Sequence, residues 1–428
     1  MFTDFLIWIS SRTPEDLAWT LFPFLMFDCL RYTFLPAALC FYDFFGTLIG
    51  RPFRFSTPKD ATYFPSVAVM IVGINEADTI EHALRSIYGS YPNLEIFVVD
   101  DGSTDGMAEK AERFAAKNRN VTVLRRKQRG GKSSAMNMPL PFIKSEIIVV
   151  IDSDSELAPG AIPMIVQPFA DPKVGAVSGC VSSRNPGVNL CTFMQAFEYR
   201  RSIFLGRLFL ARMGLLGIVS GALGAFRKSA LDQVGAWDVG PGEDGDLTLR
   251  LRKAGYEIGF VPEALCLTNV PTAWKRLIKQ RRRWEWAAIT FECRKHIDMA
   301  NPFNKHFNIR DFILIFERWL FNVFLVFINV GYFVYLFTCV EPDVAIRLLG
   351  LCYVAYLLTD VLQSAMLMCY SPDRKRDWPL LLAVPLMPLY YLLMKFVTFW
   401  AITEELLFRR SFRDNFVPER VRKVTWHW

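Results

Sequence analysis

Histidine is scarce in this chain, which has only four His in 428 residues, and its nine Cys show neither paired nor metal-binding spacing. The His residues lie far from one another along the sequence, at positions 82, 296, 306 and 427. We therefore expect neither a zinc site nor a Ser-His-Asp arrangement. Five Cys fall in apolar runs and four are scattered through the middle of the chain, which favours buried free thiols and a reducing compartment.

Charged residues are also few, at 21%, whereas hydrophobic residues make up 52%. The 37 Phe and 11 Trp suit contact with lipid as well as a protein core. The apolar residues concentrate at the two ends, in residues 16–50 and 312–407, while the middle, about 60–300, has ordinary globular composition. The sequence therefore predicts a soluble domain inserted between membrane segments.

A membrane-spanning helix needs about 20 predominantly apolar residues. The candidate spans are residues 16–40, 312–340, 344–370 and 378–407. Several charged residues within these runs are candidates for lining a path through the membrane, and helix packing explains them equally well: Asp28, Arg31, Glu317 and Asp360. Three Pro interrupt the last run, so the topology of residues 378–428 stays open. The first ten residues lack a basic start and a small-residue cleavage site, so no removable signal peptide is expected.

The formal charge of +7 comes from 49 Lys and Arg against 42 Asp and Glu. Much of the excess lies beside the apolar runs, at Arg51, Arg54, Arg281–Arg283 and Arg374–Arg376. Because cations near membrane spans favour the cytoplasmic side, we expect a cytoplasmic central domain. Nucleic acid is not expected as a partner, since the chain has no basic recognition helix and no basic motif with interleaved aromatics.

The central domain begins with an alternation of strands and helices. Apolar runs rich in Val and Ile predict strands at Val67–Val72, Leu94–Val99, 121–124 and Glu146–Ile151, with helices around 77–87 and 107–117 between them. This rhythm predicts an α/β domain with a mostly parallel sheet and a ligand at the carboxyl ends of its strands. Asp100 and Asp152 stand at two such ends. Buried carboxylates there would be costly alone, so a cation, a nucleotide or solvent should lie near them.

Six short motifs occur in order along the chain: Asn75-Glu76-Ala77, Asp100-Asp101-Gly102-Ser103, Gly131-Lys132, Asp152-Ser153-Asp154, Gly242-Glu243-Asp244 and Gln280-Arg281-Arg282-Arg283-Trp284. In this order, and with flanking spans, the chain resembles the processive, membrane-integrated branch of glycosyltransferase family 2. That branch includes cellulose, hyaluronan, chitin-oligosaccharide and poly-N-acetylglucosamine synthases, and the likeness covers nearly the whole chain.

The resemblance implies four regions. An N-terminal membrane segment is expected in residues 1–55, and a cytoplasmic GT-A-like catalytic domain in 60–270. Interfacial helices carrying the Gln280–Trp284 motif follow in 271–311, and a C-terminal transmembrane region with a basic tail occupies 312–428.

The resemblance also implies how the donor is bound. Asp101 would contact the uracil or ribose of a UDP-sugar with Glu76 nearby, although a loop Asp that stabilises a turn is the alternative. Asp152 would contact the donor and Asp154 would bind Mg²⁺ or Mn²⁺, because a hard cation takes carboxylate and phosphate oxygens; a solvated turn is the alternative. Lys132 would reach the diphosphate as a point charge, unless it is an exposed surface lysine.

Asp244, with Glu243 beside it, is the expected catalytic base. Inverting transfer needs one carboxylate that takes the proton of the acceptor hydroxyl as this hydroxyl attacks the anomeric carbon. The acidic residues also suit the first turn of a helix at Asp246–Lys253, where the helix dipole favours negative charge. Both interpretations can hold together.

Gln280, Arg283 and Trp284 share one face of a predicted helix at about 273–290. That face would present Gln280 and Arg283 to donor phosphates and the Trp284 indole to an acceptor sugar. An amphipathic helix lying at the membrane interface is the alternative. Ser220 and Gly221 resemble the family's segment near the acceptor, and close packing explains these small residues equally well.

The predicted activity is inverting transfer from a UDP-sugar, preferably UDP-N-acetylglucosamine, to a growing β-linked polysaccharide at the membrane, possibly with its export. The expected partners are the donor, the polysaccharide or oligosaccharide acceptor, the lipid bilayer and accessory membrane or export subunits. The alternatives are a single-transfer enzyme acting on a lipid carrier, a β-glucan synthase using UDP-glucose, and a non-enzymatic scaffold or transporter.

Overall fold

The structure is a computed structural model that describes residues 11–48, 62–238, 240, 242–305, 307–414 and 417–425. Predictions that rest on Arg51, Arg54, His306 and His427, and on the side chains of Asp28 and Arg31, lie outside the described residues. The chain divides into two compact units. One unit holds Phe316–Thr403 and the described residues before position 54; the other holds the described residues of Phe55–Ile315 and Glu404–Trp428.

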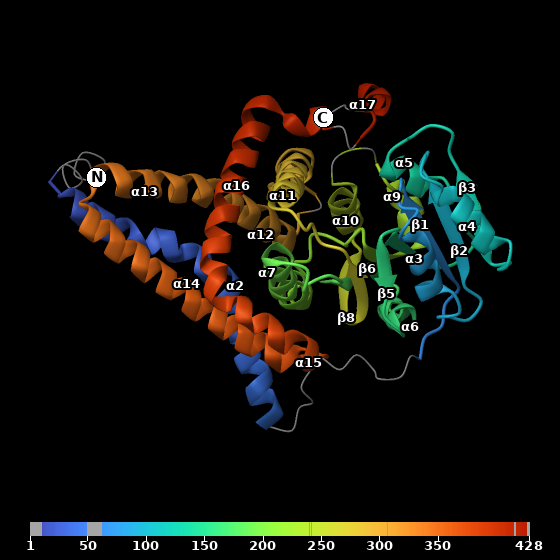
Figure 1. Cartoon of the computed structure of the whole chain (residues 1–428), viewed down its shortest axis with the longest axis horizontal. Helices are drawn as coiled ribbons and strands as arrows, with labels where there is room; N and C mark the ends of the chain where they lie inside the picture. Colours follow the sequence, from blue (N-terminus) through green and yellow to red (C-terminus); the bar gives the residue numbers. More distant parts are fainter. Residues whose placement is uncertain are drawn as a thin grey trace. The chain divides into compact units, whose positions relative to one another are not determined.

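The second unit is built on an eight-stranded sheet with the strand order β3-β2-β1-β4-β7-β6-β8-β5 (Figure 1). In chain order the strands are β1 Val67–Gly73, β2 Glu95–Asp100, β3 Val121–Arg125, β4 Ile147–Asp152, β5 Ser155–Leu157, β6 Val174–Ser183, β7 Leu223–Arg227 and β8 Glu257–Thr268. The first four strands in the spatial order are parallel, as are β6 and β8, while β7 and β5 run antiparallel to their neighbours. The predicted α/β class with a mostly parallel sheet is confirmed.

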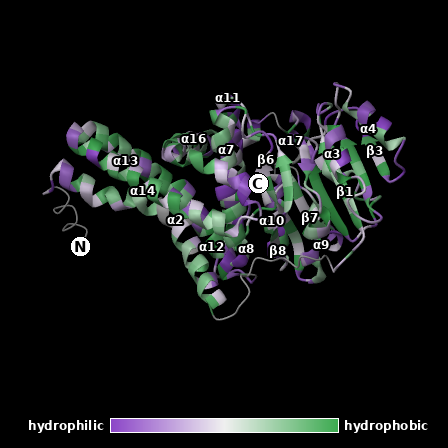
Figure 2. Ribbon diagram, turned by 60° about the horizontal axis from the view of Figure 1, so that its bottom comes forward, coloured by the Kyte–Doolittle hydropathy of each residue, from purple (hydrophilic) through white to green (hydrophobic). Residues whose placement is uncertain are grey.

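Helices cover both faces of this sheet, as the continuous apolar sequence of its central strands predicts. Alternate residues of β1 point to opposite faces. Val67, Val69 and Ile71 enter a core with α3 (Ile80–Ile87), α4 (Met107–Ala115) and α6 (Ala161–Ile165). Ala68, Met70 and Val72 enter a second core with α5 (Lys132–Asn137), α9 (Lys228–Val234) and α10 (Glu243–Lys253). Figure 2 shows the hydrophobic residues concentrated in strands such as β1.

The strand register brings the acidic motifs to one edge of the sheet. Gly73 at the end of β1 is the partner of Asp100 on β2, and Val72 is the partner of Asp152 on β4. Because these three strands are parallel, their carboxyl ends meet, which is where ligands bind in such sheets.

The rest of the second unit is helical. It contains α7 (Leu190–Tyr199), the π-helix η2 (Arg200–Gly206), α8 (Arg207–Arg212), α11 (Trp274–Ala288), the π-helix η3 (Ile289–Lys295) and η4 (Ile297–Ala300). The 3-10 helix η7 (Arg410–Arg413) and α17 (Glu419–Thr425) also belong here. Within this unit Arg420 donates to the backbone oxygen of Arg129 at 2.7 Å, so the basic tail lies against the loop before α5.

The first unit contains α2 (Pro14–Leu48), η5 (Trp319–Phe324), α13 (Leu325–Cys339), α14 (Pro342–Tyr370), α15 (Arg374–Asp377) and η6 (Trp378–Leu386). The helices α12 (Ile309–Arg318) and α16 (Met387–Phe408) each run from one unit into the other. Among the described residues three helical stretches are long and apolar enough to cross a membrane: Ile309–Cys339, Pro342–Tyr370 and Arg374–Phe408. The three predicted C-terminal spans coincide with them. Membrane crossing by α2 stays a prediction.

The three Pro of the last apolar run do not end the helix. They fall in and after η6, where the chain forms a 3-10 helix that passes directly into α16. Polar residues in the first unit are turned toward helix partners: Gln363 of α14 donates to Thr33 of α2 at 2.9 Å, and Asp360 is fully buried. This is the usual arrangement of polar side chains in membrane helices, which pair inside the bundle. A role for Asp360 in lining a path stays a prediction.

Candidate active site

Asp101 holds the loop that leads into α5. Its two carboxylate oxygens accept hydrogen bonds from the backbone N–H groups of Gly130 and Gly131, each at 2.7 Å. The Asp101 side chain is only 5% exposed, and Arg126 lies 3.5 Å from it. Asp101 therefore fixes the backbone just before Lys132. The predicted contact of Asp101 with a nucleoside stays a prediction.

Lys132 is the first residue of α5 and lies among the acidic motifs. Its Nζ donates to Asp152 at 2.6 Å and lies 3.7 Å from a Glu243 oxygen. Burial alone would lower the pKa of Lys132, but the negative charges of Asp152 and Glu243 raise it well above its ordinary value. Lys132 is therefore a charged, largely enclosed ammonium group and not an exposed surface lysine.

Gly221 lies between Lys132 and Asp244. A Cβ added at Gly221 would lie 2.9 Å from the Lys132 Nζ and 3.8 Å from an Asp244 oxygen. A side chain at this position would therefore displace the ammonium group. The structure brings Gly221, predicted near the acceptor, together with residues predicted for the donor and for catalysis.

Glu243 and Asp244 form the first turn of α10, which begins three residues before the predicted start. The helix follows Gly242, whose φ of 73° lies in the left-handed region. Burial raises the pKa of the Glu243 carboxyl, and the ammonium group of Lys132 opposes this shift. The Asp244 carboxylate accepts from the backbone N–H of Gly245 at 2.9 Å. The predicted acidic first turn is confirmed, and the role of Asp244 as base stays a prediction.

Asp154 and Glu76 add further negative charge beside Asp152. Burial and the charge of Asp152 raise the pKa of Asp154. Burial and the charge of Asp154 likewise raise the pKa of Glu76. Since these carboxylates disfavour one another's ionised forms, a bound cation would stabilise the group.

The described residues contain no cluster of three or more His, Cys, Asp or Glu placed to hold a metal ion on its own. Asp152 and Asp154 fit a hard divalent cation that takes its other ligands from phosphate and water, which is how Mg²⁺ usually binds at phosphate sites.

The Gln280–Trp284 motif lies on α11, as predicted. Its three Arg side chains are held by carboxylates: Arg281 by Glu198 at 2.6 Å, Arg282 by Glu404 at 2.5 Å and Arg283 by Asp414 at 3.3 Å. Arg281 also stacks over the Trp284 indole at 4.1 Å from the ring centroid, and this indole is 45% exposed. Among the residues that the structure describes, the buried Gln280 side-chain oxygen has no hydrogen-bond partner, so it could accept a hydrogen bond from a ligand.

The motif's helix approaches the start of α10. Gln280, Trp284 and Ala287 share a face of α11, and a Cβ added at Gly242 would lie 3.0 Å from the Ala287 side chain. The face with the exposed indole therefore continues directly toward Glu243 and Asp244. Arg283 is held by Asp414 on the chain after η7, and its predicted contact with the donor stays a prediction.

Arg207 is a neighbour of this site that no sequence motif indicated. Its guanidinium donates to the Ser178 hydroxyl at 3.1 Å, and the same hydroxyl accepts from the backbone N–H of Ser220 at 3.2 Å. Burial lowers the pKa of Arg207, and the negative charge of Asp244 opposes this shift. A single Arg within a helix carries no recognisable spacing, so only the fold reveals this position.

The chain matches the protein family described as Glycosyltransferase like family 2 over residues 65–287. It is 31% identical over 221 residues to a poly-beta-1,6-N-acetyl-D-glucosamine synthase of Staphylococcus epidermidis, covering 51% of this chain and 53% of that protein. It is 29% identical over 261 residues to the synthase of the same name from Staphylococcus aureus strain MSSA476, covering 59% and 63%. The match thus spans between half and two thirds of these relatives' length.

The fold is similar to that of the mannosyltransferase PcManGT from Pyrobaculum calidifontis, whose structure was solved with GDP-Man and Mn²⁺. The TM-score is 0.59 with 22% sequence identity, over 83% of this chain and 99% of that one. This likeness supports the GT-A-like fold. The family match extends from β1 to the end of the Gln280–Trp284 helix and takes in more than half of the chain, so the chain belongs to glycosyltransferase family 2.

Proposed function

We propose that this protein is a membrane-integrated, metal-dependent, inverting glycosyltransferase that transfers N-acetylglucosamine from UDP-N-acetylglucosamine to a growing β-linked polysaccharide. The observation that carries the proposal is the position of the Lys132 ammonium group, 2.6 Å from Asp152 and 3.7 Å from Glu243, with Asp244 across Gly221. The Lys132 ammonium group thus lies beside both Asp152, expected to bind the donor, and Glu243, expected at the catalytic position.

Donor binding follows from the charges at this edge of the sheet. Asp152 and Asp154 would hold Mg²⁺ or Mn²⁺, which when bound neutralises the diphosphate and stabilises it as a leaving group. Lys132 exchanges part of its contact with Asp152 for a phosphate oxygen, and the unpartnered oxygen of Gln280 accepts a hydrogen bond from the donor. Asp101 keeps the Gly130–Gly131 backbone in place for the nucleoside, and Glu76 borders the same space.

Catalysis is assigned to Asp244. Its carboxylate takes the proton of the acceptor hydroxyl while the oxygen of that hydroxyl attacks the anomeric carbon from the side opposite the diphosphate. The C–O bond to the diphosphate breaks with its electron pair leaving on UDP, so an α-linked donor gives a β-linked product. Glu243 lies beside Lys132 and keeps its ammonium group directed into the site.

The acceptor would lie on Trp284. The indole is nearly half exposed, and its orientation is fixed by the stacked Arg281, which Glu198 holds in turn. Flat aromatic surfaces bind sugar rings through their apolar C–H faces. Ser220 and Gly221 border the same space next to Asp244, and their small size leaves room for the acceptor.

The preference for N-acetylglucosamine rests on the two staphylococcal relatives, which are named as poly-beta-1,6-N-acetyl-D-glucosamine synthases. The three long apolar helices support work at a membrane. The cations beside the apolar runs favour a catalytic unit on the cytoplasmic side, from which the polymer would pass outward. Accessory membrane or export subunits would act at this stage.

The test is a donor panel with the purified full chain in lipid nanodiscs. Protein with Mg²⁺ receives radiolabelled UDP-N-acetylglucosamine, UDP-glucose or GDP-mannose, and the products are separated by size and analysed for linkage. We expect long β-linked chains from UDP-N-acetylglucosamine alone. Incorporation of a single sugar into lipid would support the lipid-carrier alternative, and polymer from UDP-glucose the β-glucan alternative. Absence of incorporation from all three donors would contradict the proposed function.

A further inference from the structure

The short π-helix η3 touches the start of the helix that carries Asp244. A Cβ added at Gly242 would lie 2.7 Å from the Phe291 ring, and one added at Gly245 would lie 2.3 Å from it. Only glycine allows this close approach on both sides of Glu243 and Asp244. Segments of π-helix are rare and occur frequently at functional sites. The position of η3 therefore determines where the first turn of α10 lies.

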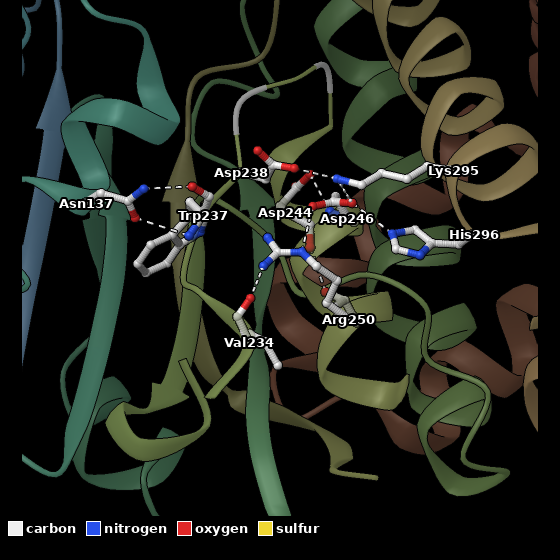
Figure 3. A network of polar contacts seen from close by, with 11 residues as sticks. Asn137, Val234, Trp237, Asp238, Asp244, Asp246, Arg250, Lys295 and His296 are labelled. Carbon is white, nitrogen blue, oxygen red and sulfur yellow. Dashed lines mark hydrogen bonds and ion pairs between the residues drawn. The ribbon is translucent and has the colours of Figure 1, made fainter. Parts of the chain in front are cut away.

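Lys295, the last residue of η3, binds two carboxylates that lie on either side of the start of α10. Its Nζ lies 2.7 Å from Asp238, which precedes α10, and 2.8 Å from Asp246, the fourth residue of α10 (Figure 3). The Lys295 side chain is only 15% exposed. Removal of a largely buried ammonium group between two carboxylates costs more than removal of one partner of an exposed ion pair, because it leaves buried charges without compensation.

Trp237, the residue before Asp238, is hydrogen-bonded to α5. The Asn137 side chain donates to the backbone oxygen of Trp237 at 2.7 Å and accepts from its backbone N–H at 3.1 Å (Figure 3). Because Asn137 ends the short helix that Lys132 begins, Trp237 and Asp238 connect the helix of the expected donor lysine to Lys295. Lys295 then continues this connection to α10.

The Asp246 carboxylate has partners besides Lys295. Its oxygens also bind the Arg250 guanidinium at 2.9 Å and the His296 Nε2 at 2.8 Å, and the side chain is 7% exposed. Burial lowers the pKa of His296, and its Nε2–H donates because the Asp246 carboxylate oxygen can only accept. Arg250 lies on the same helix as Asp246, so Lys295 is the group whose charge joins α10 to both η3 and Asp238.

Two other residues of η3, Thr290 and Arg294, bind the chain after α11 near Glu405 and Ser411. Arg294 binds the carboxylate of Glu405, which is fully buried, and donates to its backbone oxygen at 2.8 Å. Thr290 donates to the Ser411 hydroxyl at 3.0 Å, and Ser411 donates to Glu405. The η3 helix is thus attached to the chain around the end of α16, and it transmits this fixed position to α10 through Phe291 and Lys295.

We propose that Lys295 is a positioning residue for sugar transfer, which holds the first turn of α10 against η3 and Asp238 so that Asp244 lies at its working distance from the acceptor and from the donor beside Lys132. The inference rests on the proposed function. Lys295 acts through Asp244 and touches neither substrate, so its loss should slow the reaction and leave donor binding unchanged. Misplacement of a reacting group by about 1 Å costs rates on the order of 100-fold.

The test compares three variants of the full chain in nanodiscs. Lys295→Gln removes the charge, Lys295→Arg retains it, and Lys253→Gln is the matched control, because Lys253 joins the same α10 to Asp298 through an exposed ion pair at 2.6 Å. The kcat and the KM for UDP-N-acetylglucosamine are measured, together with UDP binding and the unfolding temperature.

We expect Lys295→Gln to lower kcat by about 10- to 100-fold with KM and UDP affinity within about twofold of the wild type. Lys295→Arg should recover a large part of the loss, and Lys253→Gln should match the wild type. A wild-type kcat in Lys295→Gln, a parallel loss of UDP binding, or an equal loss in Lys253→Gln would overturn the inference while wild-type activity stands. A wild type without transferase activity would overturn the proposed function itself.

Discussion

The Lys132 Nζ donates to an Asp152 oxygen at 2.6 Å, which joins the N-terminus of α5 to the carboxyl end of β4. The two residues stand 20 positions apart in the sequence, and neither motif alone indicates that they meet. Their contact places a cation at the centre of an acidic group that includes Glu243. The Lys132 ammonium group is therefore already oriented before a diphosphate binds at this site.

Replacing Lys132 by Gln should therefore weaken binding of UDP. Loss of a charge-assisted contact in an enclosed site raises the Kd by about 10- to 100-fold. The measurement is isothermal titration of UDP in the presence of Mg²⁺. Lys228→Gln is the matched control, because Lys228 forms an ion pair with Asp232 of its own helix α9. An unchanged Kd for Lys132→Gln would remove Lys132 from the donor site.

Trp284→Ala should weaken the acceptor and spare the donor. Truncation of a Trp that anchors a ligand typically costs about 10-fold or more in affinity. The kcat/KM for an added oligosaccharide acceptor should fall by about this factor, with the UDP affinity unchanged. Trp274→Ala is the control, since Trp274 begins the same helix and is 37% exposed. An equal fall in UDP affinity would contradict an acceptor surface on Trp284.

The raised pKa of Asp154 predicts that stabilisation of the protein by divalent cations depends on pH. Its pKa is raised by burial and by Asp152, so in metal-free protein its contribution to stability declines as the pH rises from the unfolded pKa, about 3.9, through the folded one. A bound cation would stabilise the ionised carboxylate and so offset this loss of stability. Added Mn²⁺ with UDP should raise the unfolding temperature more at pH 7.5 than at pH 5, and Asp154→Asn should abolish the increase. An identical increase in the variant would place the cation elsewhere.

The lowered pKa of Asp246 predicts the opposite dependence of stability on pH. Burial alone would raise its pKa, but the hydrogen bond from His296 and the charges of Arg250 and Lys295 hold it well below its ordinary value. Its contribution to stability is therefore present above the unfolded pKa, about 3.9, and is lost as the pH falls through the folded one. Asp246→Asn should destabilise the protein at pH 7 and flatten its acid-unfolding curve. Parallel curves for variant and wild type would exclude this linkage.

Much of the catalytic unit could be predicted from local patterns. Runs such as Val67–Val72 are long, β-branched and apolar, so they specify buried strands, and a parallel sheet then brings Asp100 and Asp152 to one edge. The predicted helix start, Asp246, lies three residues after Glu243, where α10 begins, because acidic residues suit positions on both sides of a helix start. Acidic side chains also stabilise a helix N-terminus, and the structure uses Glu243 and Asp244 in this way.

Long-range contacts could not be predicted in the same way. Arg294 and Glu405 are 111 positions apart, and each is a single charged residue without a motif. The same holds for Arg207, which lies near Asp244 only because η2 and α8 fold back beside β6. The described residues after Glu404, which belong to the predicted C-terminal transmembrane region and basic tail, group with the catalytic unit. Such pairings depend on the whole topology.

The most direct measurement is sugar incorporation by Asp244→Asn. A general base contributes about 10²- to 10⁴-fold to the rate, and Asn cannot take a proton. We expect kcat to fall by this factor in nanodiscs with UDP-N-acetylglucosamine, the UDP affinity to stay unchanged, and the surface control Asp232→Asn to match the wild type. Wild-type incorporation by Asp244→Asn would contradict the assignment of this carboxylate as the base and, with it, the proposed mechanism.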